Sequence, residues 1–237
     1  MAKERSDQTP APVSSRPEIA EFLERVRALG PASASGRRGR LIFALDATMS
    51  RQPTWDTACT LQAGMFRSAA AAGGLDIQLV YFRGLGECRA SGWVASGERL
   101  AQLMSAIDCR GGHTQIRKIL GHARAETERR KVQALVFVGD AMEEPVDDLC
   151  VAAGELGLLG VPVFLFQEGH DPIAEQAFRE IARLTRGAYC RFAPGAAHEL
   201  AELLRAVAAY AAGGLAALAE LSDRRHAGAL KLLAQLK

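Results

Sequence analysis

Apolar runs and amphipathic stretches alternate along most of this chain. The unbroken run Leu41 to Leu45, which Asp46 follows, predicts a strand buried on both faces, as in the centre of a parallel sheet. Further strands are predicted at residues 76–82, 132–138, 161–166 and 188–192. Helices are predicted at residues 54–72, 96–107, about 115–130, 143–159, 171–187 and 196–212. Residues 84–93 read as loop, with a possible short edge strand at 92–95. This alternation predicts an α/β fold: a doubly wound, mostly parallel central sheet with helices on both faces, Rossmann-like in its order.

The ends of the chain differ in pattern from this alternating region. Residues 1–14 are polar, include two prolines and predict a disordered arm. Residues 15–37 predict a helix, opened by a Ser15–Glu18 capping box, and then a linker. Residues 38–212 form the α/β domain, and residues 213–237 a helical tail.

Composition narrows the functional classes. Hydrophobic residues make up 49% and charged residues 24%, and the net charge of +2 is too small to favour nucleic acid or a membrane surface. The most apolar stretch, residues 206–221, is mostly alanine and contains two glycines and Glu220, which makes it a poor membrane span. The polar N-terminus does not resemble a signal peptide. The five cysteines are odd in number and form no CxxC pair, so we expect reduced thiols in a cytoplasmic protein.

Three oxygen-bearing segments lie where strands end or helices begin. The first is Asp46-x-Thr48-x-Ser50, directly after the first strand. The second is the glycine turn that ends in Thr114, and the third is Asp140, directly after the strand at 132–138. Open α/β sheets bind ligands at the carboxyl ends of their strands. Carboxylate and hydroxyl oxygens suit Mg²⁺ or Mn²⁺ and do not suit zinc.

Together these segments resemble the von Willebrand factor A-type (VWA) domain with its metal-ion-dependent adhesion site (MIDAS). The motif of that family reads Asp-x-Ser-x-Ser, then a Thr in a second loop, then an Asp in a third, and the resemblance covers about residues 38 to 212. It implies that Thr48 and Ser50 bind Mg²⁺ or Mn²⁺ directly and that Thr114 binds directly or through water. Asp46 and Asp140 would hold waters and orient the hydroxyls.

The implied function is adhesion, not catalysis. An ion with few anionic ligands stays electrophilic and keeps an open position, which an Asp or Glu side chain of a partner protein can fill. The sequence does not identify that partner. Arg51, Arg110 and His113 are expected on loops at the same end of the sheet, where a positive rim would favour an acidic partner. Glu143 and Glu144 would partly cancel that rim.

Simpler interpretations remain open for each residue. Asp46 and Asp140 could cap the helices that follow them, and Ser50 and Thr114 could be ordinary caps. His113 could be a rim residue that does not touch the metal.

Two other functions compete with adhesion. A metal-free scaffold could bind partners through the helix faces at Phe22 and Leu230. A haloacid dehalogenase-type, Mg²⁺-dependent phosphohydrolase would need a second Asp where Thr48 stands. A nucleotide site is disfavoured, because neither G-x-G-x-x-G nor a Walker A sequence follows the first strand.

Overall fold

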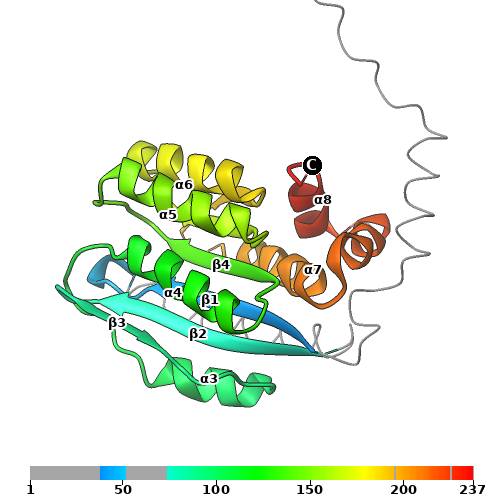
Figure 1. The fold of residues 1–237 in the computed structure, drawn as a ribbon, viewed down its shortest axis with the longest axis horizontal. Helices are drawn as coiled ribbons and strands as arrows, with labels where there is room; N and C mark the ends of the chain where they lie inside the picture. Colours follow the sequence, from blue (N-terminus) through cyan, green and yellow to red (C-terminus); the bar gives the residue numbers. More distant parts are fainter. Residues whose placement is uncertain (1–37, 52–73, 195, 225, 237) are drawn as a thin grey trace, which may run out of the picture. The chain divides into compact units, whose positions relative to one another are not determined.

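A six-stranded sheet forms the centre of this computed structural model, which describes residues 38–51, 74–194, 196–224 and 226–236. The strands are β1 (Gly39–Asp46), β2 (Leu75–Arg83), β3 (Glu87–Ala90), β4 (Ala134–Gly139), β5 (Val163–Glu168) and β6 (Ala188–Phe192). Their order across the sheet is β3-β2-β1-β4-β5-β6 (Figure 1). Every neighbouring pair is parallel except β2 and β3. The carboxyl ends of β1, β4 and β5 therefore lie side by side at one edge.

Helices cover both faces of the sheet. They are α3 (Gly97–Ser105), α4 (Ile116–Arg129), α5 (Val146–Leu158), α6 (Pro172–Thr185), α7 (Ala197–Asp223) and α8 (Ala227–Leu233), with a 3₁₀ turn at Met49–Arg51. In Figure 1, α4, α5 and α6 lie on one face, and α3 and α7 on the other. This arrangement confirms the predicted fold class, a doubly wound and mostly parallel α/β sheet.

The alternation of side chains along β1 explains why both faces are covered. Leu41, Phe43 and Leu45 join a core with α3, α7 and α8. Ile42 and Ala44 join a second core with α4, α5 and α6. Since successive side chains point to opposite faces, a strand that is apolar at every position needs a helical layer on each side.

The strand at one edge of the sheet, β3, differs from the prediction. Residues 84–93 were expected to be loop, yet Glu87–Ala90 pairs with β2 as an antiparallel strand. The strand is short and polar and half of it is exposed, so no apolar run marks it in the sequence. The expected edge strand at 92–95 is only a single bridge between Ile77 and Val94.

The helix boundaries that differ most from the prediction are the start of α5 and the end of α7. Helix α5 begins at Val146, three residues after the predicted start, which leaves Glu143 and Glu144 in a loop. Helix α7 continues past residue 212 and is interrupted at Gly214, whose φ of 67° and ψ of −159° are not helical. The boundary between a domain ending at 212 and a tail at 213–237 stays a prediction. The segments predicted at 1–14, 15–37 and 54–72 lie outside the described residues.

Helix α7 is the one described helix that is long and apolar enough, by length and composition alone, to cross a membrane. The apolar stretch lies within residues 198–223, and 44% of it is buried inside the protein. The helix contacts β1, β2, β4 and α8. These contacts are those of a core helix in an α/β sheet.

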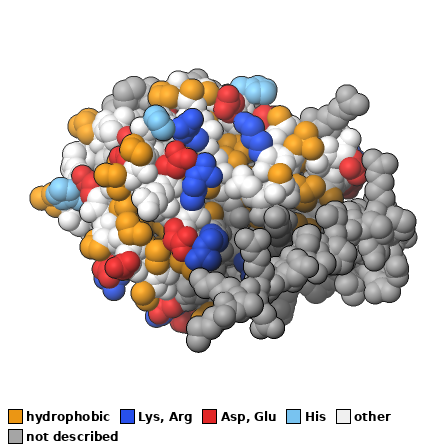
Figure 2. Space-filling view, turned by 90° about the horizontal axis from the view of Figure 1, so that it is seen from above, with side chains coloured by type: hydrophobic (Ala, Val, Ile, Leu, Met, Phe, Trp, Pro, Cys, Tyr) orange, Lys and Arg blue, Asp and Glu red, His pale blue; other side chains and the backbone are white. Residues whose placement is uncertain are grey.

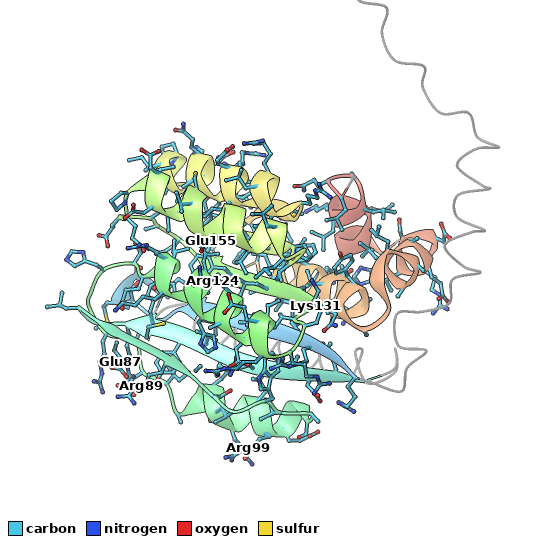
Figure 3. All side chains as sticks on the ribbon, in the orientation of Figure 1. Glu87, Arg89, Arg99, Arg124, Lys131 and Glu155 are labelled. Atoms are coloured by element: carbon cyan, nitrogen blue, oxygen red, sulfur yellow. The ribbon has the colours of Figure 1, made fainter. Side chains whose placement is uncertain are left out.

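Charged side chains on the described surface are mostly paired. Arg124 of α4 donates to the Glu155 carboxylate of α5 at 2.8 Å, and both are labelled in Figure 3. Figure 2, seen from the side of α5 and α6, shows basic and acidic side chains next to one another.

Candidate metal centre

The first loop holds three oxygen-bearing side chains in a fixed arrangement. Asp46 is completely buried at the end of β1, and its Oδ1 accepts a hydrogen bond from the Thr48 N–H at 2.7 Å. The Thr48 and Ser50 hydroxyl oxygens are 3.1 Å apart, within hydrogen-bonding distance. The Asp-x-Thr-x-Ser spacing therefore places one carboxylate and two hydroxyls together where β1 ends.

Asp140 comes to the same place from the next strand. Strands β1 and β4 are paired in parallel, and a Cβ added at Gly139 would lie 3.5 Å from the Asp46 Cβ. It would also lie 2.7 Å from Cζ of Phe137, so only glycine fits before Asp140 without displacing that ring. The two carboxylates interact electrostatically, as Asp140 contributes to raising the pKa of Asp46.

Two buried carboxylate oxygens at this edge lack a hydrogen bond. They are Asp46 Oδ2 and Asp140 Oδ1, neither of which has a partner among the described residues. Burial raises the pKa of the Asp46 carboxyl from 3.8 to about 6, although its hydrogen bonds with Thr48 act in the opposite direction. A buried anionic oxygen without a partner is costly, and a bound cation would satisfy both.

Carboxylates alone do not complete a metal site. Among the described residues, no three His, Cys, Asp or Glu side chains are grouped closely enough to hold an ion. The rest of any coordination shell would come from the Thr48 and Ser50 hydroxyls and from water. A set of two carboxylates and several hydroxyls fits Mg²⁺ or Mn²⁺, which prefer hard oxygen ligands and keep several waters.

The second loop, which carries Thr114, is bound to the first. The Arg110 N–H donates to the Ala47 carbonyl at 3.0 Å, and the His113 N–H donates to the Gly84 carbonyl at 3.3 Å. A Cβ at Gly112 would lie only 2.0 Å from that Gly84 carbonyl oxygen. The close approach of these two backbones therefore requires glycine at position 112.

Thr114 is fixed by the third loop. Its hydroxyl accepts from the Glu143 N–H at 3.0 Å, and its own N–H donates to the Glu143 carboxylate at 3.0 Å. The hydroxyl proton and one lone pair remain for another partner. Thr114 is not a helix cap: Gln115 is the N-cap of α4 and makes no capping bond with its side chain. The alternative interpretation of Thr114 as an ordinary cap is therefore wrong.

Glu144 caps α4 in its place. Its carboxylate accepts from the Ile116 N–H at 2.5 Å and from the Arg117 N–H at 3.0 Å. A carboxylate at a helix N-terminus also interacts favourably with the helix dipole. Both glutamates of the third loop thus hold the second loop in place, a role that sequence reasoning missed because their partners are about thirty residues away.

The predicted positive rim is not what the structure contains. Arg51 is buried, with 1% of its surface exposed, and its guanidinium contacts the Glu168 carboxylate at the end of β5. Arg110 pairs with Asp108 at 3.1 Å, and His113 Nδ1 lies 3.1 Å from the Glu143 carboxylate. Each of the three predicted basic side chains therefore has a carboxylate beside it.

Known protein sequences give no family assignment. No family model matches this chain, and no curated protein matches it. Many solved structures share its architecture, and three of them illustrate the likeness. An aerotolerance-related membrane protein from Bacteroides fragilis NCTC 9343 has a TM-score of 0.54 and 15% identity, covering 70% of this chain and 96% of that chain. The SpRpn10 VWA domain has a TM-score of 0.56 and 11% identity, and the match covers 67% of this chain and 89% of that domain's chain. The pilus adhesin SpaC from Lactobacillus rhamnosus GG has a TM-score of 0.57 and 11% identity, covering 74% and 30%.

The chain has the VWA fold. At such low identity the likeness is one of fold alone, so the site must be judged from its own residues. Within this VWA fold, Asp46, Thr48 and Ser50 form one bonded group, which Asp140 faces from β4. Thr114 is connected to the group through Glu143 and the third loop. That these five residues bind one ion stays a prediction.

Proposed function

We propose that this protein is a protein-interaction module that binds Mg²⁺ or Mn²⁺ and uses the ion to hold an acidic side chain of a partner protein. Asp46, Thr48, Ser50, Thr114 and Asp140 would hold the ion. When bound, the ion supplies a Lewis-acidic position for the carboxylate of a partner's Asp or Glu. The observation that carries the proposal is the pair of buried carboxylate oxygens, one on Asp46 and one on Asp140, that lack a hydrogen bond beside two clustered hydroxyls.

Proteins with the same fold support the interaction role. SpaC is a pilus adhesin, and human Sec24c, with a TM-score of 0.54 and 11% identity, is a COPII-coat protein. A function in binding other proteins is therefore suggested by the fold. The phosphohydrolase alternative gains no support, because Thr48 stands where a second catalytic carboxylate would be needed.

Thermal unfolding with and without divalent ions tests the metal. We expect millimolar Mg²⁺ or Mn²⁺ to raise the Tm of the wild-type protein, since a ligand that binds only the folded state stabilises it. Asp46→Asn should abolish the increase. Asp148→Asn is the matched control, because Asp148 is an exposed carboxylate on α5. An identical Tm in Mn²⁺ and in EDTA would contradict the metal site.

Peptide selection tests the partner chemistry. A random peptide library displayed on phage would be bound to the protein in Mg²⁺ and eluted with EDTA. We expect the eluted peptides to share an Asp or Glu, and we expect Asp46→Asn not to retain them. Peptides that bind equally well in EDTA would favour the metal-free scaffold instead.

A further inference from the structure

Arg51 is the largest fully buried side chain in the described part of the protein. It ends the 3₁₀ turn that carries Ser50, and its backbone N–H donates to the Thr48 carbonyl at 3.1 Å. The backbone that positions the two hydroxyls thus also positions this guanidinium. A buried arginine directly after the hydroxyl pair requires a physical explanation, since a buried charge must be paired.

The position of its partner shows where the guanidinium lies. Arg51 follows β1, whereas Glu168 ends β5, and β4 lies between these strands in the sheet. The side chain must therefore cross the carboxyl end of β4, from which Asp140 follows. The guanidinium accordingly interacts with Asp140 and Asp46 as well as contacting Glu168. One cation faces carboxylates from three neighbouring strands.

Among the described residues, the carboxylates of Asp46, Asp140 and Glu168 face the Arg51 guanidinium. Within this described group, three negative charges stand beside one positive charge, which favours a further cation. Arg51 cannot lose its proton at any ordinary pH, so its charge is permanent. A divalent ion bound between Asp46 and Asp140 would be repelled by this fixed positive charge at short range.

We propose that Arg51 is a tethered cation that partly neutralises Asp46 and Asp140 when no divalent ion is bound and weakens the binding of the ion when it is present. This inference rests on the proposed function, because it concerns the affinity of the same site. The site would keep its shape without metal, and it would fill only when the free divalent ion is abundant. Arg51 would be a positioning and tuning residue, and it would not itself contact the partner.

Isothermal titration with Mn²⁺ and thermal unfolding in EDTA test the proposal together. We expect Arg51→Met to bind Mn²⁺ more tightly than wild type by about tenfold or more, because the repelling charge is gone. The same variant should have a lower Tm in EDTA, and Mn²⁺ should restore it. Arg51→Lys keeps the charge and should bind Mn²⁺ within about threefold of wild type.

Arg40→Met is the matched control. Arg40 is also buried and paired, with its guanidinium 2.8 Å from the Glu126 carboxylate, but it lies near the opposite end of β1. Its loss should lower the Tm and leave the Mn²⁺ affinity unchanged. Should Arg51→Met fail to fold, the double variant Arg51→Met with Glu168→Gln removes the charge of both partners. It should still bind Mn²⁺ more tightly than wild type, by a smaller factor, because the negative charge of Glu168 is lost as well.

The outcomes separate the two proposals. Equal or weaker Mn²⁺ binding by Arg51→Met or the double variant, beside clear binding by wild type, overturns the role of Arg51 and leaves the metal site standing. If the variants bind Mn²⁺ and the wild-type protein does not, the role of Arg51 as a tethered cation is supported. The metal-dependent function of the natural protein is then overturned. Absence of binding in every variant overturns both.

Discussion

The Thr114 hydroxyl accepts a hydrogen bond from the Glu143 backbone at 3.0 Å, and the Glu143 carboxylate accepts one from the Thr114 backbone, also at 3.0 Å. This reciprocal pair joins two loops that the sequence separates by about thirty residues. One bond holds the Thr114 hydroxyl and the other holds the Thr114 backbone, and both come from Glu143. The third loop therefore sets the direction of that hydroxyl. The position of Thr114 in the candidate site therefore depends on Glu143.

Two substitutions at Thr114 distinguish the contribution of its hydroxyl from that of its branched shape. Thr114→Val keeps the branched side chain but leaves the Glu143 N–H without its acceptor, so we expect a loss of about 1–2 kcal/mol in unfolding free energy. Thr114→Ser keeps the hydroxyl and should cost less. Chemical denaturation measures both losses, and Mn²⁺ titration should show weaker binding only for the valine variant. Equal Mn²⁺ affinity in the two variants would show that the Thr114 hydroxyl does not contribute to binding of the ion.

Most of the sheet could be predicted from apolar runs alone. The run at Leu41 to Leu45 lies within β1, and the strand at 188–192 has the predicted bounds. Strand β1 is buried at every position, and its consecutive apolar residues record this burial in the sequence. The polar edge strand Glu87–Ala90 was missed because its stability comes from pairing with β2, which no local pattern records.

The oxygen donors of the candidate site could be proposed from the sequence, whereas the burial and pairing of its charged side chains could not. The motif spacing located Asp46, Thr48 and Ser50 together, and the expectation that ligands bind at the carboxyl ends of the strands placed Asp140 at the same side of the sheet. The burial of Arg51 could not be read from the sequence, because it depends on Glu168, which is more than a hundred residues away. Long-range ion pairs of this kind are visible only once the strand order is known.

Glu144 should contribute to stability through the N-terminus of α4. Its carboxylate accepts from the Ile116 and Arg117 N–H groups, whereas the N-cap residue itself makes no capping bond with its side chain. Glu144→Ala should therefore lower the unfolding free energy by about 1–2 kcal/mol. Hydrogen exchange should quicken at these two amides. Unchanged exchange there would show that the cap does not form in solution.

Asp46→Asn should stabilise the protein when no divalent ion is present. The raised pKa of Asp46, about 6 against 3.8, means that the folded state disfavours the charged carboxylate. Asparagine retains the oxygen that accepts from the Thr48 N–H and removes the charge. In EDTA near pH 8 we expect the variant to exceed wild type by about 1–3 kcal/mol in unfolding free energy.

The pH dependence of this difference follows from the same shift. Because the folded-state pKa is the higher one, wild type loses stability from this group as the pH rises from about 4 through about 6. The advantage of Asp46→Asn should therefore vanish near pH 4 and reach its full size above pH 7. Denaturation curves across this range in EDTA measure it. An advantage that is constant with pH would mean that the charge of Asp46 is not its cause.

Leu85 should contribute to partner binding without contributing to stability. Its side chain is 84% exposed in the turn between β2 and β3, and the neighbouring Gly84 carbonyl accepts from the His113 N–H beside the candidate site. A large apolar side chain held at the rim of a binding site gives a partner an apolar surface to bury. With peptides selected in Mg²⁺, we expect Leu85→Ser to weaken binding severalfold and leave the Tm unchanged. Leu158→Ser is the control, since Leu158 is 92% exposed at the far end of α5. Equal weakening by both variants would indicate a nonspecific apolar effect, because Leu85, unlike Leu158, follows a residue that is bonded to His113, next to Thr114.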